Sequence, residues 1–447
     1  MTIQLQSKAL VSLALPLVIG QVAQTGIGVV DTMIAGSYSK QDLAGVALGT
    51  AVWLPVFLFF SGVLLALTPL IAQAIGRQDQ SAIRHGLMQG IWLSLFLSAM
   101  AISLIIFISN QLYWLHVEHS VEQTARYYLW TLAAGVLPAL LYQTIRFFHE
   151  GHGFTAITMR LSIFGFLANI PLNYIFVYGW GPIPEMGGAG CGIATSLVYL
   201  LMMFGAWWFY FKQPGYQAYR DHWQWFGPQR QSQHQLLKVG TPIAAAILFE
   251  VGLFTFIAFL ITPLGTDVLA AHQIAISYTS FIFMLPLSLA MALTIRVGQL
   301  HGAQELHQLH QTLKSAYLLA IAIGLTVTLL TFFFADWVVN AYTQDPSVKN
   351  IAITLLWLAA LYQLSDAVQV ISAGALRGIQ DTAAVMWITF IAYWAIGLPT
   401  GYWLCYGGLS TDQPWWGVNG FWFSFVVGLT VAALGLTWRV KHQFFRR

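Results

Sequence analysis

Acidic side chains stand inside apolar runs that are long enough to cross a membrane. Asp31 lies within QTGIGVVDTMIAGS, and the run that begins near Ala9 holds no other charge before Lys40. A carboxylate at the centre of a membrane helix costs roughly 2.5–3.5 kcal/mol on insertion scales, so such residues usually face an interior and carry a function. We therefore take Asp31 as a candidate for binding a proton or a cation.

The residues around Asp31 extend this candidate into a polar stripe. Gln21, Gln24, Gly28 and Asp31 follow one another at helical spacing, so they share one face and are candidates for lining a substrate path. Pro16 removes a backbone donor and allows a bend earlier in the same helix. The alternative, a carboxylate that reaches an interface, stays open because the apolar run ends soon after Asp31.

A second polar pair lies in the fifth apolar run. Asn169 and Asn173 are four residues apart, on one face of a helix, with Pro171 between them. Their amides can hydrogen-bond a carboxyl group. Amides between membrane helices also serve packing alone, and this alternative stays open.

The second half of the chain holds two further acids in apolar runs. Glu250 lies in AAAILFEVGLFTFIAFL, and Asp366 shares a helical stripe with Tyr362, Gln363 and Gln369. Two carboxylates that are close together and desolvated cannot both stay ionised, so we expect them to hold a proton or to coordinate Na⁺. The alternative is that both acids only stabilise packing.

Large aromatic and flexible side chains are frequent in the same runs. Trp53, Phe57, Phe281 and Met284 are candidates for contacting a substrate. Such surfaces suit flat, cationic or amphipathic ligands. Packing against neighbouring helices or lipid is the alternative for each of them.

The composition indicates an integral membrane protein that crosses the bilayer many times. Of the 447 residues, 58% are hydrophobic and only 8% are charged, a balance that no soluble domain could present to water. Twelve apolar runs reach the length of about 20 residues that a membrane-spanning helix needs. The runs are 9–34, 44–72, 87–108, 125–148, 156–178, 190–212, 237–261, 268–297, 315–335, 351–374, 384–406 and 416–439.

The basic residues predict an orientation. With the N-terminus inside, all but three of the 19 Lys and Arg fall in cytoplasmic loops and tails, Arg146 and Arg377 among them. This distribution predicts a multi-pass inner-membrane protein with both termini in the cytoplasm. We attribute the net charge of +3 to the basic residues of the predicted cytoplasmic loops, and we expect no nucleic-acid partner.

The sequence contains two internal repeats of six predicted spans each. Pro16 aligns with Pro242, and Ala66-Leu67-Thr68 aligns with Ala292-Leu293-Thr294. Because each half starts on the same side, the repeats are parallel and related by an axis along the membrane normal. We predict lobes at 1–212 and 237–447, joined by a cytoplasmic amphipathic linker at 213–236, with a substrate cleft between the lobes.

Other chemistry receives less support. His149, Glu150 and His152 are close in sequence, but we expect solvated side chains in a cytoplasmic loop rather than a metal site. The sequence has no G-x-x-x-x-G-K-[ST] motif, so ATP-driven pumping is not expected. Cys191 and Cys405 are expected to be packed in helices, although a disulfide between them stays open.

Several stretches resemble the multidrug and toxic compound extrusion (MATE) family, especially its bacterial NorM-like branch. These stretches are LALPLVIGQVAQTGIGVVDTMIAG, LAGVAL, LAAHQI, NIPLNYIFVYG and GALRGIQDT. The resemblance implies the all-α MATE fold of two six-helix lobes and a secondary transporter rather than an enzyme. It implies export of organic cations, cationic dyes and fluoroquinolone-like drugs in exchange for Na⁺ or H⁺ by alternating access. We expect a monomer in membrane lipid that needs no cofactor besides the coupling ion.

The resemblance also implies roles for single residues. Asp31, Asn169 and Asn173 match the first-lobe cation or proton site, although Asn173 stands where archaeal members often have Asp. Proton exchange in this lobe would then rest on Asp31 alone. The second-lobe cation site is matched by Glu250, Tyr362 and Asp366, and Pro16 matches the proline at which the first helix bends.

Two other functions compete with drug export. A flippase for lipid-linked precursors would need a strongly basic cleft for phosphates, whereas Lys and Arg are nearly absent from the predicted span interiors. A membrane-embedded enzyme would need acid, base or metal groups that converge near a loop. The candidate acids are instead dispersed over three runs.

Overall fold

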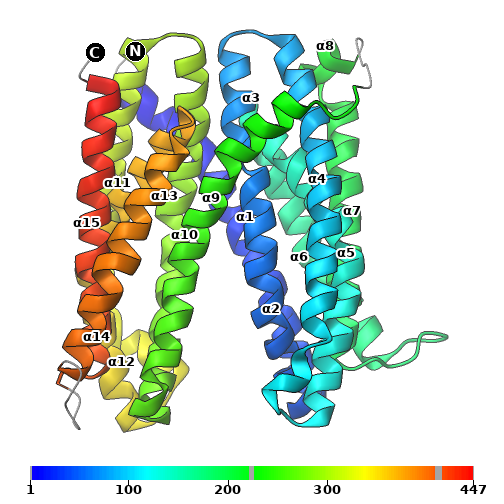
Figure 1. Ribbon diagram of the computed structural model, residues 1–447, viewed down its shortest axis with the longest axis vertical. Coiled ribbons are helices and arrows are strands. Elements are labelled where there is room, and N and C mark those ends of the chain that lie inside the picture. The colour runs from blue at the N-terminus through cyan, green and yellow to red at the C-terminus, as the bar shows by residue number, and fades with distance from the viewer. Residues whose placement is uncertain (1–2, 221–225, 408–414, 446–447) are drawn as a thin grey trace. The chain divides into compact units, whose positions relative to one another are not determined.

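The computed structural model describes residues 3–220, 226–407 and 415–445. Twelve helical segments in this part of the chain are long and apolar enough to cross a membrane, which confirms the predicted number of spans (Figure 1). The predicted linker at 213–236 is only partly described, and its Trp223 and Trp225 lie outside the described residues. Its remainder forms short helical turns and the start of a long helix.

The elements follow one another without a strand among the residues described. They are α1 (Ile3–Tyr38), α2 (Lys40–Leu64), α3 (Leu67–Gly76), α4 (Gln80–Ser109), η1 (Leu112–Leu115), α5 (His119–Gly151), α6 (Thr155–Tyr178), α7 (Gly188–Lys212), η2 (Pro214–Tyr216), α8 (Gln217–Arg220), α9 (Arg230–Ile261), η3 (Thr262–Leu264), α10 (Thr266–Gly302), α11 (Leu306–Tyr342), α12 (Pro346–Gly378), α13 (Thr382–Phe390), the π-helical η4 (Ile391–Gly397), α14 (Leu398–Tyr406) and α15 (Val418–Phe445).

The chain packs into two compact units. Unit 2 comprises Leu15–Ala244, and unit 1 comprises Met1–Ala14 together with Ala245–Arg447. These units differ from the predicted lobes at the first helix of each. The opening turns of α1 belong to unit 1, and the opening turns of α9 belong to unit 2. The sequence repeat marks where similar segments begin, but it does not show which neighbours they pack against.

Hydrogen bonds hold the opening turns of α1 within unit 1. The Ser315 hydroxyl donates to the Ile3 carbonyl at 2.9 Å, and the Thr312 hydroxyl donates to Gln6 Oε1 at 3.0 Å. Gln6 is fully buried. Because a buried amide needs partners, these contacts fix this segment on α11.

The repeat is visible in the backbone as well as in the sequence. Gly187 and Gly417 begin the last long helix of their halves, and both have a positive φ, of 55° and 54°. Gln78 and Gln304, also at equivalent positions, have φ of 58° and 59°. Such values are rare for non-glycine residues, so their recurrence shows that both halves fold through the same turns.

One apolar core in unit 2 joins the helices that carry the first candidate site. Its buried members include Ile27 of α1, Tyr142 of α5, Leu161 of α6 and Met202 of α7. Unit 1 has its own core, which includes Leu253 of α9, Leu356 of α12 and Phe425 of α15. Each candidate site is therefore positioned by the packing of its own unit.

The span at 382–406 is not a regular helix. Its centre, Ile391–Gly397, is π-helical and is followed by Pro399. Because proline has no N–H, the regular ladder cannot continue through it, and the wider turn precedes it. Trp394 in this turn donates through Nε1 to the Phe249 carbonyl at 3.1 Å. The π turn thereby holds α9 directly beside Glu250.

We expect Gly190→Ala to lower stability because α7 approaches α6 closely there. A Cβ at Gly190 would lie 2.4 Å from the Phe176 carbonyl oxygen, and its counterpart Gly420 is equally crowded, at 2.6 Å from the Cys405 nitrogen. Overpacking of this kind costs about 1–3 kcal/mol. In detergent, the melting temperatures of Gly190→Ala and Gly420→Ala should both lie below that of the wild type. Gly36→Ala is the control, since its nearest contact is an ordinary 3.5 Å to the Leu43 side chain; an equal loss there would contradict the argument.

Candidate functional site

The Asp31 carboxylate is buried in unit 2 and is surrounded by hydrogen-bond donors. Oδ1 accepts from the Asn169 and Asn173 amides at 3.1 and 2.8 Å, and Oδ2 accepts from the Thr195 hydroxyl at 2.7 Å. Only 3% of Asp31 is exposed. Charge-assisted hydrogen bonds are stronger than neutral ones, so this arrangement stabilises the ionised carboxylate away from water.

Local structure places the donors around Asp31. Asn169 and Asn173 lie one turn apart on α6, and the Asn173 amide also donates to the Asn169 carbonyl at 3.0 Å. Thr195 comes from α7, where the Cys191 thiol lies 3.5 Å from the Asp31 carbonyl. The spacing of the two asparagines predicts their shared face. Thr195 carried no signal in the sequence, because a threonine in an apolar helix is common and its contact is long-range.

The amide oxygens of the two asparagines remain unused. Asn169 Oδ1 and Asn173 Oδ1 are buried and have no hydrogen-bond partner among the described residues. Their nitrogens therefore face Asp31 while their oxygens are free to accept. In this orientation the site offers N–H and O–H donors to one carboxylate, and turning either amide would present its oxygen instead to an acid proton or to a cation. The chemistry of these groups therefore admits a proton or a cation.

A second polar cluster in unit 2 centres on Arg146 of α5. Its Nε donates to Glu150 Oε1 at 2.7 Å, Nη1 donates to Gln24 Oε1 at 2.8 Å, and Nη2 donates to Gln21 Oε1 at 3.1 Å. Nη1 also lies 3.4 Å from Gln143 Oε1. We call these five residues the Arg146 cluster. Gln21 and Gln24, predicted to line a substrate path, have their carbonyl oxygens bound inside unit 2.

The prediction of solvated loop side chains was wrong for His149 and Glu150, whereas the side of the membrane on which they lie stays a prediction. Helix α5 extends to Gly151, so Arg146, His149 and Glu150 are helical and buried. His149 Nδ1 lies 2.6 Å from the Tyr216 hydroxyl, and burial raises the pKa of that hydroxyl well above its usual value. The apolar run ends earlier than helix α5 because the last turns of the helix carry polar side chains, which are buried against polar groups of the protein rather than against lipid.

The prediction that Arg377 lies in a loop was also wrong, whereas its side of the membrane stays a prediction. Arg377 lies in the last turn of α12 and interacts electrostatically with Glu250. Arg146 lies inside the predicted run 125–148 and Arg377 lies beyond the predicted run 351–374, so the prediction that Lys and Arg are nearly absent from the span interiors is not overturned. Arg146 forms an ion pair with Glu150, whereas no ion pair of Arg377 was found among the described residues and its Nε has no hydrogen-bond partner there.

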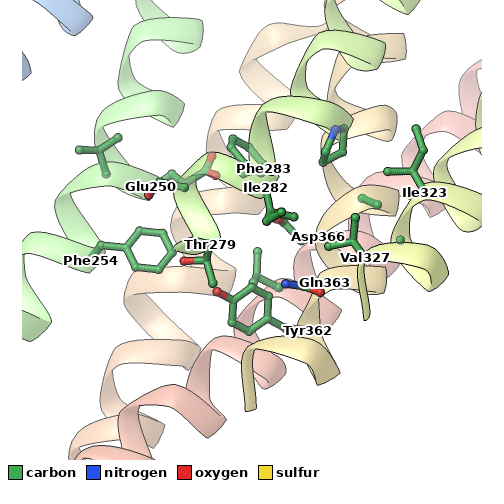
Figure 2. A pocket seen from close by; sticks show the side chains of 16 residues that line it. Glu250, Phe254, Thr279, Ile282, Phe283, Ile323, Val327, Tyr362, Gln363 and Asp366 are labelled. Carbon is green, nitrogen blue, oxygen red and sulfur yellow. The ribbon is translucent and has the colours of Figure 1, made fainter. Parts of the chain in front are cut away.

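The acids of unit 1 line one cavity of about 150 Å³. Figure 2 shows Glu250 entering from α9 and Asp366 from α12, with Thr279 and Tyr362 beneath them. Gln363 also lines this cavity, and its amide lies 3.0 Å from the Thr331 hydroxyl. The structure thus brings Glu250 together with Tyr362, Gln363 and Asp366. Helical spacing in the sequence places only the last three on a common face.

The two acids of this cavity are less compensated than Asp31. Glu250 and Asp366 interact electrostatically, and the charge of Arg377 attracts Glu250. Asp366 Oδ1 is buried and, within the described ranges, has no hydrogen-bond partner. Free carboxylate oxygens with a nearby phenol and amide are the ligand types that Na⁺ accepts. No group of three His, Cys, Asp or Glu that could hold a metal was found among the described residues, so neutral oxygens would complete such a site.

The other substrate candidates have varied surroundings. Trp53 is buried and stacks on Phe57 with ring centroids 5.2 Å apart, whereas Phe281 is 55% exposed. Met284 is half-buried, and Gly28 is exposed. Gln369 is buried, and its Oε1 has no partner in the part of the chain that the structure describes. Cys191 and Cys405 are both free and buried.

Known proteins resemble this chain over nearly its whole length. The MatE family matches residues 16–175 and 242–403. The multidrug resistance protein MdtK of Yersinia pseudotuberculosis serotype O:1b (strain IP 31758) is 41% identical over 98% of this chain and 95% of its own. The multidrug resistance protein NorM of Aliivibrio fischeri (strain ATCC 700601 / ES114) is 40% identical over 96% of this chain and 93% of its own.

Solved structures share the fold at lower identity. The crystal structure of the eukaryotic MATE transporter AtDTX14 has a TM-score of 0.86 and 20% identity, and covers 98% of this chain and 96% of that one. An outward-facing multidrug resistance MATE transporter of the MOP superfamily has a TM-score of 0.84 and 22% identity, with the same coverage. These matches confirm the predicted all-α MATE fold.

We expect Arg146→Met to destabilise the protein more than the double change Arg146→Met with Glu150→Met. The single variant leaves Glu150 as an unpaired buried charge, and breaking a buried ion pair from one side costs about 3–5 kcal/mol. Removing both charges avoids that penalty. Thermal unfolding of the purified protein in detergent measures the difference, and equal losses for the two variants would contradict a paired Arg146 and Glu150.

Proposed function

Because the chain belongs to the MatE family, it is a multi-pass membrane transporter rather than an enzyme, and we propose that it exports drugs in exchange for H⁺ or Na⁺. The substrates in this proposal are organic cations, cationic dyes and fluoroquinolone-like amphipathic drugs, and the relatives are named as multidrug resistance proteins. The proposed location is a bacterial inner membrane, with both termini in the cytoplasm and a monomer as the working unit.

One observation carries the proposal: each unit holds ionisable carboxylates inside its membrane-spanning helices. Asp31 lies in unit 2, and Glu250 and Asp366 lie in unit 1. Buried acids in membrane proteins mark ion and proton pathways, because their cost is kept only where their charge state is used. Apolar walls formed by Phe254, Phe283 and their neighbours complete the unit 1 cavity and suit an amphipathic ligand.

In the proposed mechanism, Asp31 is the proton site. As an anion it accepts three hydrogen bonds. A protonated Asp31 must donate one, which the Thr195 hydroxyl can accept by turning its own proton away, and the neutral acid no longer offers charge-assisted bonds to the two asparagine amides. Rotation of one asparagine amide would present an unused oxygen to the acid proton. Protonation therefore rearranges the contacts between α1 and α6, and this change couples the ion to the conformation of unit 2.

The unit 1 cavity is the proposed cation site. The free oxygen of Asp366, the Glu250 carboxylate and the Tyr362 hydroxyl supply oxygen ligands around one space. A cationic drug and the coupling ion would compete for the same negative charge, and this competition gives exchange. One charge moving through 100 mV yields about 2.3 kcal/mol, which sustains nearly two decades of drug gradient per ion.

We expect Asp31→Asn to reduce drug efflux roughly ten- to a hundredfold. The loss corresponds to the charged hydrogen bonds that the amide cannot reproduce, worth about 1.5–3 kcal/mol. The measurement is efflux of a fluorescent cationic dye from proteoliposomes. Asp336→Asn is the control, since that carboxylate is 65% exposed at the end of α11. Undiminished efflux by Asp31→Asn would remove Asp31 from the mechanism.

An imposed pH gradient and an imposed Na⁺ gradient should separate the two sites. In proteoliposomes, we expect Asp31→Asn to abolish the response to the pH gradient and to retain a response to Na⁺. Glu250→Gln combined with Asp366→Asn should have the reverse effect, because it removes the oxygen charge that holds Na⁺. If both variants lose the same response, the assignment of different ions to the two units is wrong.

A further inference from the structure

Two polar clusters attach α1 to the rest of unit 2. The first surrounds Asp31 and joins α1 to α6 and α7. The second is the Arg146 cluster, which joins α1 to α5 through Gln21 and Gln24. Gln24 lies seven residues before Asp31, so the two attachments are about two helical turns apart.

The Arg146 cluster is a permanent attachment. A guanidinium does not lose its charge at any physiological pH, and its planar fork matches two glutamine oxygens at once. Glu150 balances the charge at 2.7 Å. Gln143 extends the cluster to α2, since its amide donates to the Ser61 hydroxyl at 2.8 Å. Gln21 and Gln24 are therefore attached to α5, which is itself attached to α2, whatever the charge of Asp31.

The Asp31 attachment is conditional. This step rests on the proposed function, in which a proton neutralises the carboxylate and rearranges its three hydrogen bonds. The titratable groups that interact electrostatically with Asp31 are the Tyr128 hydroxyl on α5 and the Cys191 thiol and Tyr199 hydroxyl on α7. The charged groups of the Arg146 cluster lie about two helical turns away. Since one attachment changes and the other does not, any movement of Asp31 has to be absorbed between them.

The segment between the attachments contains two glycines. Gly26 and Gly28 lack the side chains that stiffen a helix, and Gly26 also packs closely, since a Cβ there would lie 2.7 Å from the Phe166 ring. The Thr32 hydroxyl donates to the Gly28 carbonyl at 2.9 Å, a contact that competes with the helical bond and favours bending. A Cβ at Gly28 would meet nothing within 4 Å, so this glycine is not required by packing.

We propose that Arg146 is a positioning residue that holds residues 21–24 of α1 still, so that protonation of Asp31 moves the helix only beyond a hinge at Gly26 and Gly28. Pro16 lies on the other side of this fixed segment. A bend at Pro16 alone cannot move Asp31 within unit 2 while Gln21 and Gln24 stay bound to Arg146.

The first test compares two glycine substitutions on the same helix. Gly28→Ala should slow dye efflux about fivefold at saturating dye with little change in KM, because alanine favours the straight helix by about that factor in equilibrium constant. Gly20→Ala, whose Cβ would lie 3.5 Å from Ser162 Oγ, sits before the fixed segment and should leave efflux unchanged. Equal effects of the two variants, or an effect of Gly20→Ala alone, would overturn the hinge.

The second test measures movement directly. Spin labels on exposed positions of unit 2, in a Cys191→Ala, Cys405→Ala background, give the distance from Tyr127 on α5 to Thr32 beyond the hinge and to Val22 before it. Acidification should change the distance to Thr32 and leave the distance to Val22 unchanged. Adding Gln21→Leu and Gln24→Leu should let the distance to Val22 change as well.

The outcomes separate the inference from the proposed function. Normal efflux by Asp31→Asn rejects the proposed role of Asp31. If Asp31→Asn loses efflux driven by a pH gradient, but acidification moves both labelled positions equally or moves neither, the fixed segment and its hinge are rejected while the role of Asp31 stands. A response of the Val22 distance that is the same with and without the two leucines rejects the positioning role of Arg146.

Discussion

The cost of charge inside membrane-spanning helices governs the polar interior of both units. Every buried ionisable group must be compensated by donors, by an opposite charge or by a bound ion. Asp31 is compensated by three donors, and Arg146 and Glu150 compensate each other. Asp366 keeps an oxygen with no partner among the described residues. The degree of compensation thus distinguishes the proposed proton site, a buried ion pair and the proposed cation site.

The two halves share a backbone but not a chemistry. Matching turns at Gly187 and Gly417 show that the scaffold repeats. In the repeat register, however, Glu250 aligns with Gln24 and Asp31 aligns with Ile257. A scaffold that repeats keeps its helices and turns, while buried acids occupy different depths. Two units of similar shape can therefore respond to different ions.

Much of the fold and part of the site could be predicted from sequence, for identifiable reasons. Helix length and hydropathy gave the twelve spans, and the four-residue spacing of Asn169 and Asn173 gave their common face. Contacts between distant helices, such as Thr195 with Asp31, leave no trace in spacing. The helical end of α5 was missed because Arg146, His149 and Glu150 look like a solvated loop. Only their three-dimensional partners show that they are buried.

The polar stripe of α1 shows why one pattern supports two interpretations. Glutamines on one face of a membrane helix suggest a surface for substrate, yet the oxygens of Gln21 and Gln24 are bound to Arg146. A stripe that faces substrate must keep free donors or acceptors, whereas a stripe that attaches a helix uses them within the protein. By this criterion, the lower part of the stripe attaches α1. Asp31 is the member whose attachment depends on its charge, so a helix held in this way can respond to a proton without leaving its unit.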